Sequence, residues 1–357
     1  MDSRKVHSSA QIPAVPFRSK LLAWYDAHAR DLPWREDRDP YRVWVSEIML
    51  QQTRVAAVIE HYRKFLQRFP TVRKLAAARE SSVLAAWSGL GYYRRARMLH
   101  AAAKMIVNQR GGKFPNSAAG LRDLPGVGRY TAAAVASIAF GEPVPVVDGN
   151  VARVLDRLCD ARVSNEKAWQ AAEDLLDRER PGDFNQAIME LGAIVCTPRA
   201  PACLTCPVLD LCATRGERGL SAKPTRQKKR EIHYALDCRE GSVFLVQRGN
   251  DLGLMPGMWE LPEVEAGLPQ SREKQLSRFP RNDHTNKHRH DGAEPFFTLR
   301  HSITVTDYTV RVWQMPAPSA VAGSWFAPEK ASSLALTGLA RKILQRVSNI
   351  RQNGSII

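Results

Sequence analysis

A glycine hairpin lies a short distance before a single acidic residue, and the two could serve one site. The hairpin reads Leu124-Pro-Gly-Val-Gly-Arg-Tyr-Thr131. Gly126 and Gly128 permit backbone angles and a close approach that a Cβ would block. The free N–H groups of a helix beginning after them can bind a phosphate oxygen. The hairpin therefore predicts contact with a nucleic acid backbone, although the glycines alone fit an ordinary turn between two helices equally well.

Two carboxyl groups are candidates for acid and base chemistry. Glu47 lies in an apolar helical stretch, where burial would raise its pKa and favour the protonated form that can donate a proton. The alternative is a glutamate on a solvated helix face. Asp148 follows an apolar run and precedes a helix, so it could be only a cap. Capping would also keep its carboxylate ionised, so the two roles are compatible.

Four cysteines form a third group with chemical potential. Cys196, Cys203, Cys206 and Cys212 follow the spacing C-x6-C-x2-C-x5-C. Four thiolates this close in sequence can surround one metal centre, and structural zinc is the usual occupant of such a set. Disulfides do not suit an intracellular chain. Cysteine use is otherwise low, which favours a reducing cytosol.

Helices are expected to position these residues in the first part of the chain. From Phe17 to about Cys212, apolar residues recur at helical spacing and no alternating strand pattern is present. We predict helices over residues 43–52, 55–69, 82–90 and 96–109, and another after Asn150. Residues 121–138 are predicted to form a helix-hairpin-helix, and residues 196–212 a metal-cluster loop.

The character of the chain changes near residue 213. Strand-like runs then follow at residues 234–237, 243–247 and 302–315, and a helix at 339–347. The predicted domains are a flexible arm (1–16), an all-α domain (17–215), a basic linker (216–230), an α+β domain (231–350) and a tail (351–357).

The charge of the chain indicates a polyanionic partner. Its 357 residues carry 52 Lys and Arg against 36 Asp and Glu, a net charge of +16. Such a basic chain suits nucleic acid. A membrane-surface protein is the alternative, but there is no long apolar span, and residues 1–16 have no apolar core of the signal-peptide kind. We expect a cytoplasmic monomer without membrane contact.

The order of several motifs resembles the MutY family of adenine DNA glycosylases, within the endonuclease III superfamily. The resemblance runs from Trp34 to Cys212. It rests on Val43-Trp-Val-Ser-Glu-Ile-Met-Leu-Gln-Gln-Thr53, Trp87-Ser-Gly-Leu-Gly-Tyr-Tyr93, the hairpin, Val147-Asp-Gly-Asn150, Met189-Glu-Leu-Gly192 and the four cysteines. It implies a multidomain protein whose helical domain is a helix-hairpin-helix glycosylase. It also implies one [4Fe–4S] cluster on the four cysteines, in preference to zinc.

The resemblance implies hydrolysis of an N-glycosidic bond in base excision repair. The substrate would be adenine opposite 8-oxoguanine or guanine in double-stranded DNA, in a bacterial cytoplasm at the nucleoid. Glu47 would protonate the base, and Asp148 would stabilise the sugar cation or its adduct. Asn150 would orient Asp148 or the water, and Tyr130 would lie beside both. Bifunctional relatives carry a lysine at the Tyr130 position, so we expect no efficient strand cleavage.

The resemblance also assigns DNA contacts. Gln52 and Tyr92 would insert into the duplex once the target base has left the stack. Arg35 and Glu190 would read the adenine edge. Thr53, Gly126 and Gly128 complete the predicted DNA-binding set of the helical domain.

The second domain resembles the MutT-like (Nudix) fold through Gly253-Leu-Met-Pro-Gly-Met-Trp-Glu-Leu-Pro262, but it lacks the Nudix hydrolase box. Such a domain would recognise 8-oxoguanine through a Phe-Ser-His hairpin. The matching positions here are Ile303, Thr304 and Val305, after Ser302. Val305 cannot donate the hydrogen bond of a histidine.

Two alternatives remain open from the residues. One is another glycosylase of the superfamily, acting on mismatched thymine or an oxidised pyrimidine. The other is a non-catalytic protein that binds DNA structure through the hairpin and the cysteine loop.

Overall fold

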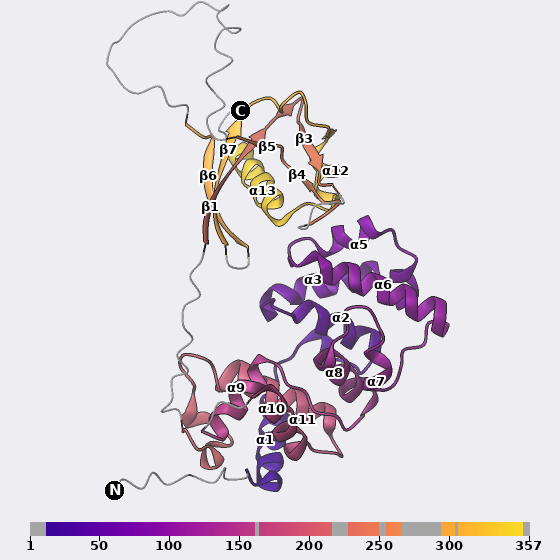
Figure 1. The fold of residues 1–357 in the computed structure, drawn as a ribbon, viewed down its shortest axis with the longest axis vertical. Helices are drawn as coiled ribbons and strands as arrows, with labels where there is room; N and C mark the ends of the chain where they lie inside the picture. Colours follow the sequence, from indigo (N-terminus) through magenta and orange to yellow (C-terminus); the bar gives the residue numbers. More distant parts are fainter. Residues whose placement is uncertain are drawn as a thin grey trace, which may run out of the picture. The chain divides into compact units, whose positions relative to one another are not determined.

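The fold is taken from a computed structural model that describes residues 12–160, 164–215, 228–249, 255–265, 294–303 and 306–352. The chain divides into two compact units. The first comprises Met1–Ala86 and Arg94–Ala222, and the second comprises Trp87–Tyr93 and Lys223–Ile357. Figure 1 draws the helices of the first unit in indigo to magenta and the strands of the second in orange to yellow.

The described part of the first unit is helical. Its helices are α1 (Ala14–His28), α2 (Pro40–Leu50), α3 (Val55–Arg68), α4 (Val72–Ala76), α5 (Glu80–Trp87), α6 (Tyr93–Arg110), α7 (Ala118–Leu121), α8 (Arg129–Phe140), α9 (Gly149–Leu158), α10 (Asn165–Leu175) and α11 (Pro181–Glu190). A π-helical turn, η2 (Leu191–Val195), extends α11. Short 3-10 turns lie at Pro33–Arg35, Cys203–Thr205 and Leu209–Leu211.

Helix α2 forms the centre of this unit. Asp39 caps its first turn by accepting a hydrogen bond from the Arg42 amide, and Pro40 suits the first helical position. Every residue of α2 from Val43 to Met49 is buried, because α2 packs against α3 on one side and α8 on another. Helix α8 also packs against α11, so three distant segments of the chain meet around one site.

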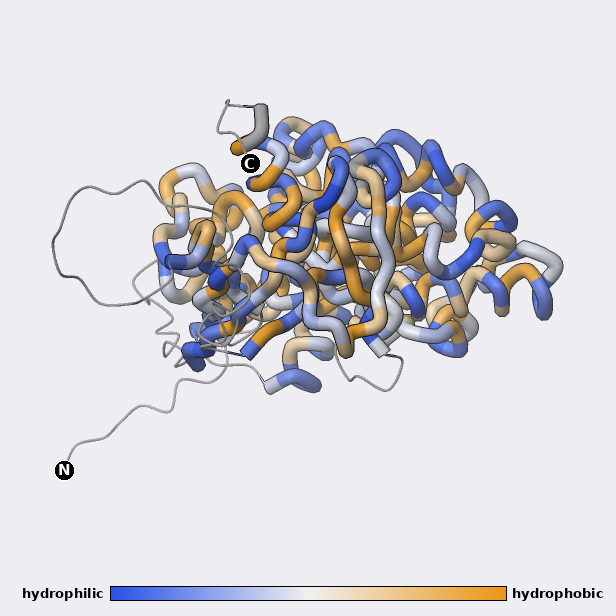
Figure 2. Tube along the Cα trace, turned by 90° about the horizontal axis from the view of Figure 1, so that it is seen from above, coloured by the Kyte–Doolittle hydropathy of each residue, from blue (hydrophilic) through white to orange (hydrophobic). Residues whose placement is uncertain are grey.

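Helix α9 shows the predicted amphipathic pattern. Val151, Val154, Leu155 and Leu158 are buried on one face. Figure 2 shows hydrophobic and hydrophilic stretches alternating along the chain, as amphipathic elements require. None of the helices in the described ranges is long and apolar enough to cross a membrane.

The second unit contains β1 (Lys228–Leu236), β2 (Cys238–Arg239), β3 (Ser242–Gln247), β4 (Trp259–Glu260), β5 (Glu263–Val264), β6 (Phe297–Ile303), β7 (Thr306–Gln314), β8 (Ser324–Phe326), α12 (Pro328–Ser333) and α13 (Gly338–Gln352). One sheet has the order β5-β1-β7-β6, with β1 parallel to β7. In the other, β3 pairs with β2, β4 and β8. Tyr234, Val310 and Val312 pack with Leu339 and Ile343 of α13 in a shared core.

Several predicted boundaries differ from the structure. The arm was expected to reach residue 16, but α1 already begins at Ala14. The linker was expected to reach residue 230, but Lys228–Arg230 belong to β1 because they pair in parallel with Thr306–Tyr308. The tail was expected from residue 351, but α13 continues to Gln352. The helix predicted over 43–52 ends at Leu50, because Gln52 adopts a left-handed backbone.

Candidate active site

Eight of the predicted site residues line one cavity of about 560 Å³ in the first unit. The cavity lies where α2, α8, α9 and α11 meet. The eight residues are Arg35, Glu47, Gln52, Thr53, Tyr130, Asp148, Asn150 and Glu190. Residues from Arg35 to Glu190 therefore come together in space, as one reaction site requires.

Glu47 is a buried acid in the wall of this cavity, only 6% exposed. Burial raises the pKa of Glu47 to about 7. The nearby charge of Asp148 adds to this effect, and a hydrogen bond from Tyr130 works against it. The structure thus places Glu47 in the environment predicted for a proton donor, and not on a solvated helix face.

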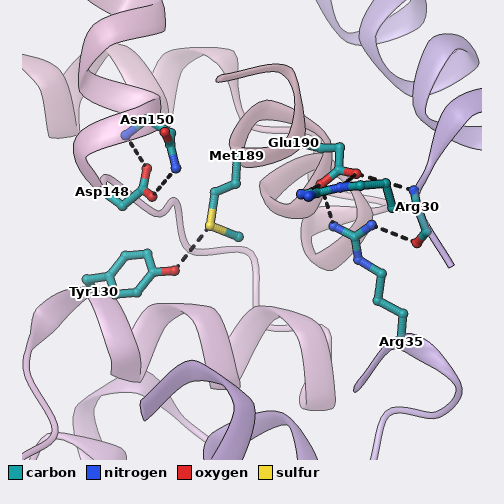
Figure 3. A network of polar contacts seen from close by, with 7 residues as sticks. All are labelled: Arg30, Arg35, Tyr130, Asp148, Asn150, Met189 and Glu190. Carbon is teal, nitrogen blue, oxygen red and sulfur yellow. Dashed lines mark hydrogen bonds and ion pairs between the residues drawn. The ribbon is translucent and has the colours of Figure 1, made fainter. Parts of the chain in front are cut away.

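Tyr130 is the contact between α8 and this acid. Its hydroxyl lies 2.8 Å from Glu47 Oε2 and 3.2 Å from the sulfur of Met189, the second contact being drawn in Figure 3. Burial raises the pKa of Tyr130 well above its usual value, and the charges of Glu47 and Asp148 act in the same direction. The hydroxyl therefore keeps its single proton and can give it to one acceptor at a time.

Asp148 is both the cap of α9 and a wall of the cavity. Its Oδ1 accepts hydrogen bonds from the amides of Asn150 and Val151 at 2.9 and 2.8 Å. Its Oδ2 accepts from the side-chain amide of Asn150 at 3.0 Å (Figure 3). All three partners are N–H donors, which bind a carboxylate in its ionised form. The side-chain amide of Asn150 thus holds one oxygen of the Asp148 carboxylate.

Arg153, which sequence reasoning missed, connects Asn150 to the segment before the cysteines. Its Nη2 donates to Asn150 Oδ1 at 2.8 Å and to the carbonyl of Gly192 at 2.7 Å, and its Nε donates to the carbonyl of Cys196. Gly192 is in close contact with Asn150, because a Cβ on it would lie 2.7 Å from the Asn150 Cβ. The spacing of Arg153 three residues after Asn150 was the available signal.

Glu190 is held by two arginines. Oε1 accepts from the amide and the Nε of Arg30, and Oε2 accepts from Nη2 of Arg30 at 2.7 Å and Nη2 of Arg35 at 3.0 Å (Figure 3). Burial acts to raise the pKa of Glu190, but these bonds outweigh it and lower the pKa to about 2. Four N–H groups fill the acceptor capacity of the carboxylate. Reading an adenine edge would require one of them to move.

The hairpin glycines have different roles. Gly126 has a φ of 77°, and a Cβ there would lie 2.5 Å from the Cβ of Met98. Gly128 is extended, with a φ of −88°, and nothing lies within 4 Å of a Cβ built on it. Of the two hairpin glycines, only Gly126 uses a backbone angle that favours glycine, because the φ of Gly128 is one that any residue adopts. Its amide precedes α8 beside open space, which leaves room for a phosphate at the helix start.

The two residues expected to enter the duplex share a strained backbone. Gln52 has a φ of 55° and Tyr92 a φ of 47°, values that non-glycine residues rarely adopt. Tyr92 is 44% exposed despite its aromatic ring. Gln52 lies in the turn that follows α2, and Tyr92 lies in the short connection between α5 and α6, directly before α6. Backbone strain of this kind concentrates at functional sites.

Two of the four cysteines, Cys196 and Cys212, contact the buried Arg157, which is 2% exposed. Arg157 Nη1 lies 3.2 Å from the sulfur of Cys196, and the Arg157 carbonyl oxygen lies 3.5 Å from the sulfur of Cys212. Burial raises the pKa of Cys206 to about 11, and the other three thiols contribute in the same direction. Within the described residues, no three His, Cys, Asp or Glu side chains are arranged to hold a metal ion. The fit to a metal centre therefore rests on the donor chemistry: four neighbouring thiols and an N–H group at one sulfur.

The predicted recognition hairpin of the second unit is described only in part. Ser302 Oγ donates to Asp307 Oδ1 at 2.5 Å, and Ile303 pairs with Thr306 across the two strands. Thr304 and Val305 lie outside the described residues.

Comparisons with known proteins extend these observations. The family described as "HhH-GPD superfamily base excision DNA repair protein" matches residues 45–178. The curated adenine DNA glycosylase of Mus musculus is 38% identical, over 94% of this chain and 78% of the mouse protein. That of Homo sapiens is 41% identical over 70% of this chain and 57% of its own length, and that of Schizosaccharomyces pombe is 34% identical over 74% and 73%.

The chain belongs to the adenine DNA glycosylase family. The prediction of an adenine DNA glycosylase acting in base excision repair is thereby confirmed. The chain spans only about three fifths of the human relative's length, but more than three quarters of the mouse relative's.

Solved structures confirm the glycosylase fold of the helical unit. A thermostable thymine-DNA glycosylase matches with a TM-score of 0.53 and 33% identity, over 57% of this chain and 96% of that one. An endonuclease III in a non-covalent DNA complex matches with a TM-score of 0.50 and 25% identity over the same shares. Both matches stop well short of the whole chain, whereas the adenine DNA glycosylase match covers 94% of it. Family membership therefore favours adenine over thymine as the target base.

Proposed function

We propose that this adenine DNA glycosylase hydrolyses the N-glycosidic bond of adenine that lies opposite 8-oxoguanine or guanine in duplex DNA. The observation that carries the proposal is the pair of unlike carboxyl groups at one cavity. Glu47 has a pKa of about 7, and Asp148 accepts only N–H donors. One group can supply a proton while the other faces the sugar as an anion.

Protonated Glu47 donates to the adenine ring, at N7 by the family resemblance. The electron pair of the bond between the sugar C1′ and the base then leaves with the adenine. Asp148 faces the oxocarbenium ion that remains, or the adduct formed from it. Water then adds to C1′ and loses a proton, which completes hydrolysis. Asn150 keeps Asp148 oriented during these steps, through the 3.0 Å bond from its side-chain amide.

Tyr130 makes the enzyme monofunctional. A phenol hydroxyl held by Glu47 and Met189 cannot attack the sugar as an amine would, so no Schiff base forms at this position. Borohydride should therefore trap little covalent complex between the protein and its DNA.

Cys196, Cys203, Cys206 and Cys212 would hold one [4Fe–4S] cluster, with zinc as the alternative. The cluster would supply a structural cross-link for the loop. Arg157 supports this proposal, because its N–H group lies at the Cys196 sulfur. Iron and sulfide analysis of the purified protein separates the two metals, since a zinc protein would be colourless and free of sulfide.

The second unit would be a MutT-like domain that recognises 8-oxoguanine through the hairpin of Ser302, Ile303 and Thr304. Gln52, Tyr92 and Thr53 would contact the distorted duplex, and Gly126 and Gly128 its phosphates. Arg35 and Glu190 would read the adenine after rearrangement of the Arg30 contact. The protein would act as a monomer in the bacterial cytoplasm, at the nucleoid.

Base release from defined duplexes tests the proposal. We expect release of adenine opposite 8-oxoguanine and guanine, and far less opposite cytosine. The Glu47→Gln variant should lose about 10²- to 10⁴-fold in single-turnover rate, because it keeps the shape of the acid and removes its proton. Release of thymine from a guanine mismatch instead would favour the thymine-glycosylase alternative. A Glu47→Gln variant with unchanged adenine release would refute the acid assignment.

A further inference from the structure

The turn that carries Gln52 is held in place by one arginine of α6. Arg95 Nη1 donates to the carbonyls of Ile48 and Met49 at 2.8 and 3.1 Å, and also to the carbonyl of Gln51. Its Nη2 donates to the hydroxyl of Thr53 at 3.2 Å. A single guanidinium thus contacts residues on both sides of Gln52.

These contacts satisfy backbone carbonyls at the C-terminal end of α2, the helix that also carries Glu47. The last carbonyls of a helix have no partner within it and carry partial negative charge. The Thr53 amide satisfies the carbonyl of Leu50 at 3.2 Å. Arg95 donates to the carbonyls of Ile48 and Met49, the two residues before Leu50. The end of α2 is therefore fixed at Leu50.

The turn is also held from its other side. The side-chain amide of Gln51 donates to the hydroxyl of Thr131 at 3.2 Å, and Thr131 is a buried residue of α8. Gln51 therefore points inward, while the neighbouring Gln52 is exposed at the rim of the cavity with a φ of 55°. An unfavourable backbone angle persists only where the surrounding contacts determine it.

We propose that Arg95 is a positioning residue that holds Gln52 in its left-handed conformation before DNA binds. The inference rests on the proposed function, in which Gln52 enters the duplex as the adenine leaves it. Because the turn is already formed in the free protein, no free energy is needed to order it when the base is unstacked. Arg95 thereby acts on base flipping through Gln52 and touches no reacting atom.

The geometry requires arginine and not merely a positive charge. The two terminal nitrogens of Arg95 reach carbonyls at the end of α2 and the Thr53 hydroxyl at the same time. A lysine presents one compact ammonium and cannot span these acceptors in the same way. The variant Arg95→Lys therefore keeps the charge and loses part of the fixation, and Arg95→Gln loses both.

Base flipping and base release should be measured separately. Duplexes with 2-aminopurine in place of the target adenine report flipping by fluorescence, and single-turnover release from an adenine:8-oxoguanine duplex reports the complete reaction. We expect Arg95→Gln to lower both flipping and adenine release by about 10- to 100-fold. The values for Arg95→Lys should lie between those of Arg95→Gln and those of the parent protein. Affinity for undamaged duplex should change little in either variant. Arg97→Gln is the matched control, because it removes an arginine of the same helix that pairs with Glu80. It should retain the parental flipping signal.

A double variant decides whether Arg95 acts through Gln52. If it does, Gln52→Ala should lower flipping by itself, and adding Arg95→Gln to it should lower flipping no further. Additive losses, or an Arg95→Gln variant with parental flipping, would overturn the inference. Failure of the parent protein to release adenine would instead contradict the proposed function, so the two failures are distinguishable. A melting temperature measured for each variant identifies any that is unfolded.

Discussion

At the scale of single residues, two chemically similar groups of the site differ widely in pKa. Glu47 and Glu190 line the same cavity, yet the pKa of one is raised to about 7 and that of the other is lowered to about 2. Both are buried, so burial does not separate them. The difference is the partner: Glu47 meets one neutral phenol, and Glu190 meets two guanidinium groups. The first can donate a proton at neutral pH and the second cannot.

The pH dependence of the reaction follows from Glu47. Its pKa lies above the usual carboxyl value, so the protonated donor is abundant below about pH 7 and is lost as the pH rises through that value. We expect the single-turnover rate of adenine release to fall about tenfold per pH unit on the alkaline side. A profile that stays flat from pH 6 to 9 would show that Glu47 is not the proton donor.

Replacing Tyr130 by phenylalanine should move that alkaline limb. The hydrogen bond from Tyr130 lowers the pKa of Glu47 and opposes the effect of burial. In the Tyr130→Phe variant, Glu47 should therefore keep its proton to a higher pH. The midpoint of the alkaline fall in rate should shift to a higher pH. Rate profiles of the two proteins in the same buffers check this, and a downward shift would show that the phenol instead stabilises the protonated acid.

At the scale of elements, sequence reasoning succeeded where local spacing decides. The buried face of α9 could be predicted because its four apolar residues recur within one helix. The three-residue contact of Arg30 and Arg35 with Glu190 could not, since Glu190 lies 155 to 160 residues from the two arginines and nothing in either segment specifies the pairing. The contact of Met189 with Tyr130 could not be predicted either, because these residues are also far apart in the sequence. Helix ends were also misplaced, because the end of α2 depends on Arg95 from another helix.

Alanine substitutions at the two hairpin glycines should have different effects, one on the stability of the protein and the other on its binding to duplex DNA. Gly126→Ala places a Cβ 2.5 Å from that of Met98 at a positive φ, so we expect a loss of about 1–3 kcal/mol in stability. Gly128→Ala meets open space and should leave the melting temperature nearly unchanged. It should instead weaken duplex binding, because the added methyl occupies room at the start of α8. Thermal melts and duplex titrations of both variants check this contrast, and a destabilised Gly128→Ala protein would contradict it.

At the scale of the whole molecule, charge is the dominant property. A net charge of +16 on 357 residues gives general attraction to a phosphate backbone that precedes any recognition of a base. The change from helical periodicity to strand-like runs was visible in the sequence, but the assignment of Trp87–Tyr93 to the second unit was not, because it depends on contacts between distant segments. The parallel pairing of β1 with β7 was not visible, since it joins residues about 80 positions apart.

Binding to undamaged duplex should be strongly salt dependent. If about six phosphates are neutralised, affinity should fall by about 10³-fold between 50 and 200 mM salt. Fluorescence anisotropy with one duplex at several salt concentrations gives the slope. A slope near zero would mean that the positive charge does not face the DNA. The single-turnover rate at saturating protein should change much less than the affinity.

The contact between Gly192 and Asn150 has a consequence for mutational tolerance. Any nucleotide change that converts a glycine codon to that of another amino acid adds at least a Cβ, and here that atom would press on the residue that orients Asp148. The Gly192 carbonyl accepts a hydrogen bond from Arg153, but Gly192 is not among the residues predicted to contact the substrate, and its backbone angle is not unusual. A substitution there would nonetheless disturb the Asp148 carboxylate through Asn150, so a fitness cost would arise at a position that the predicted substrate contacts do not include.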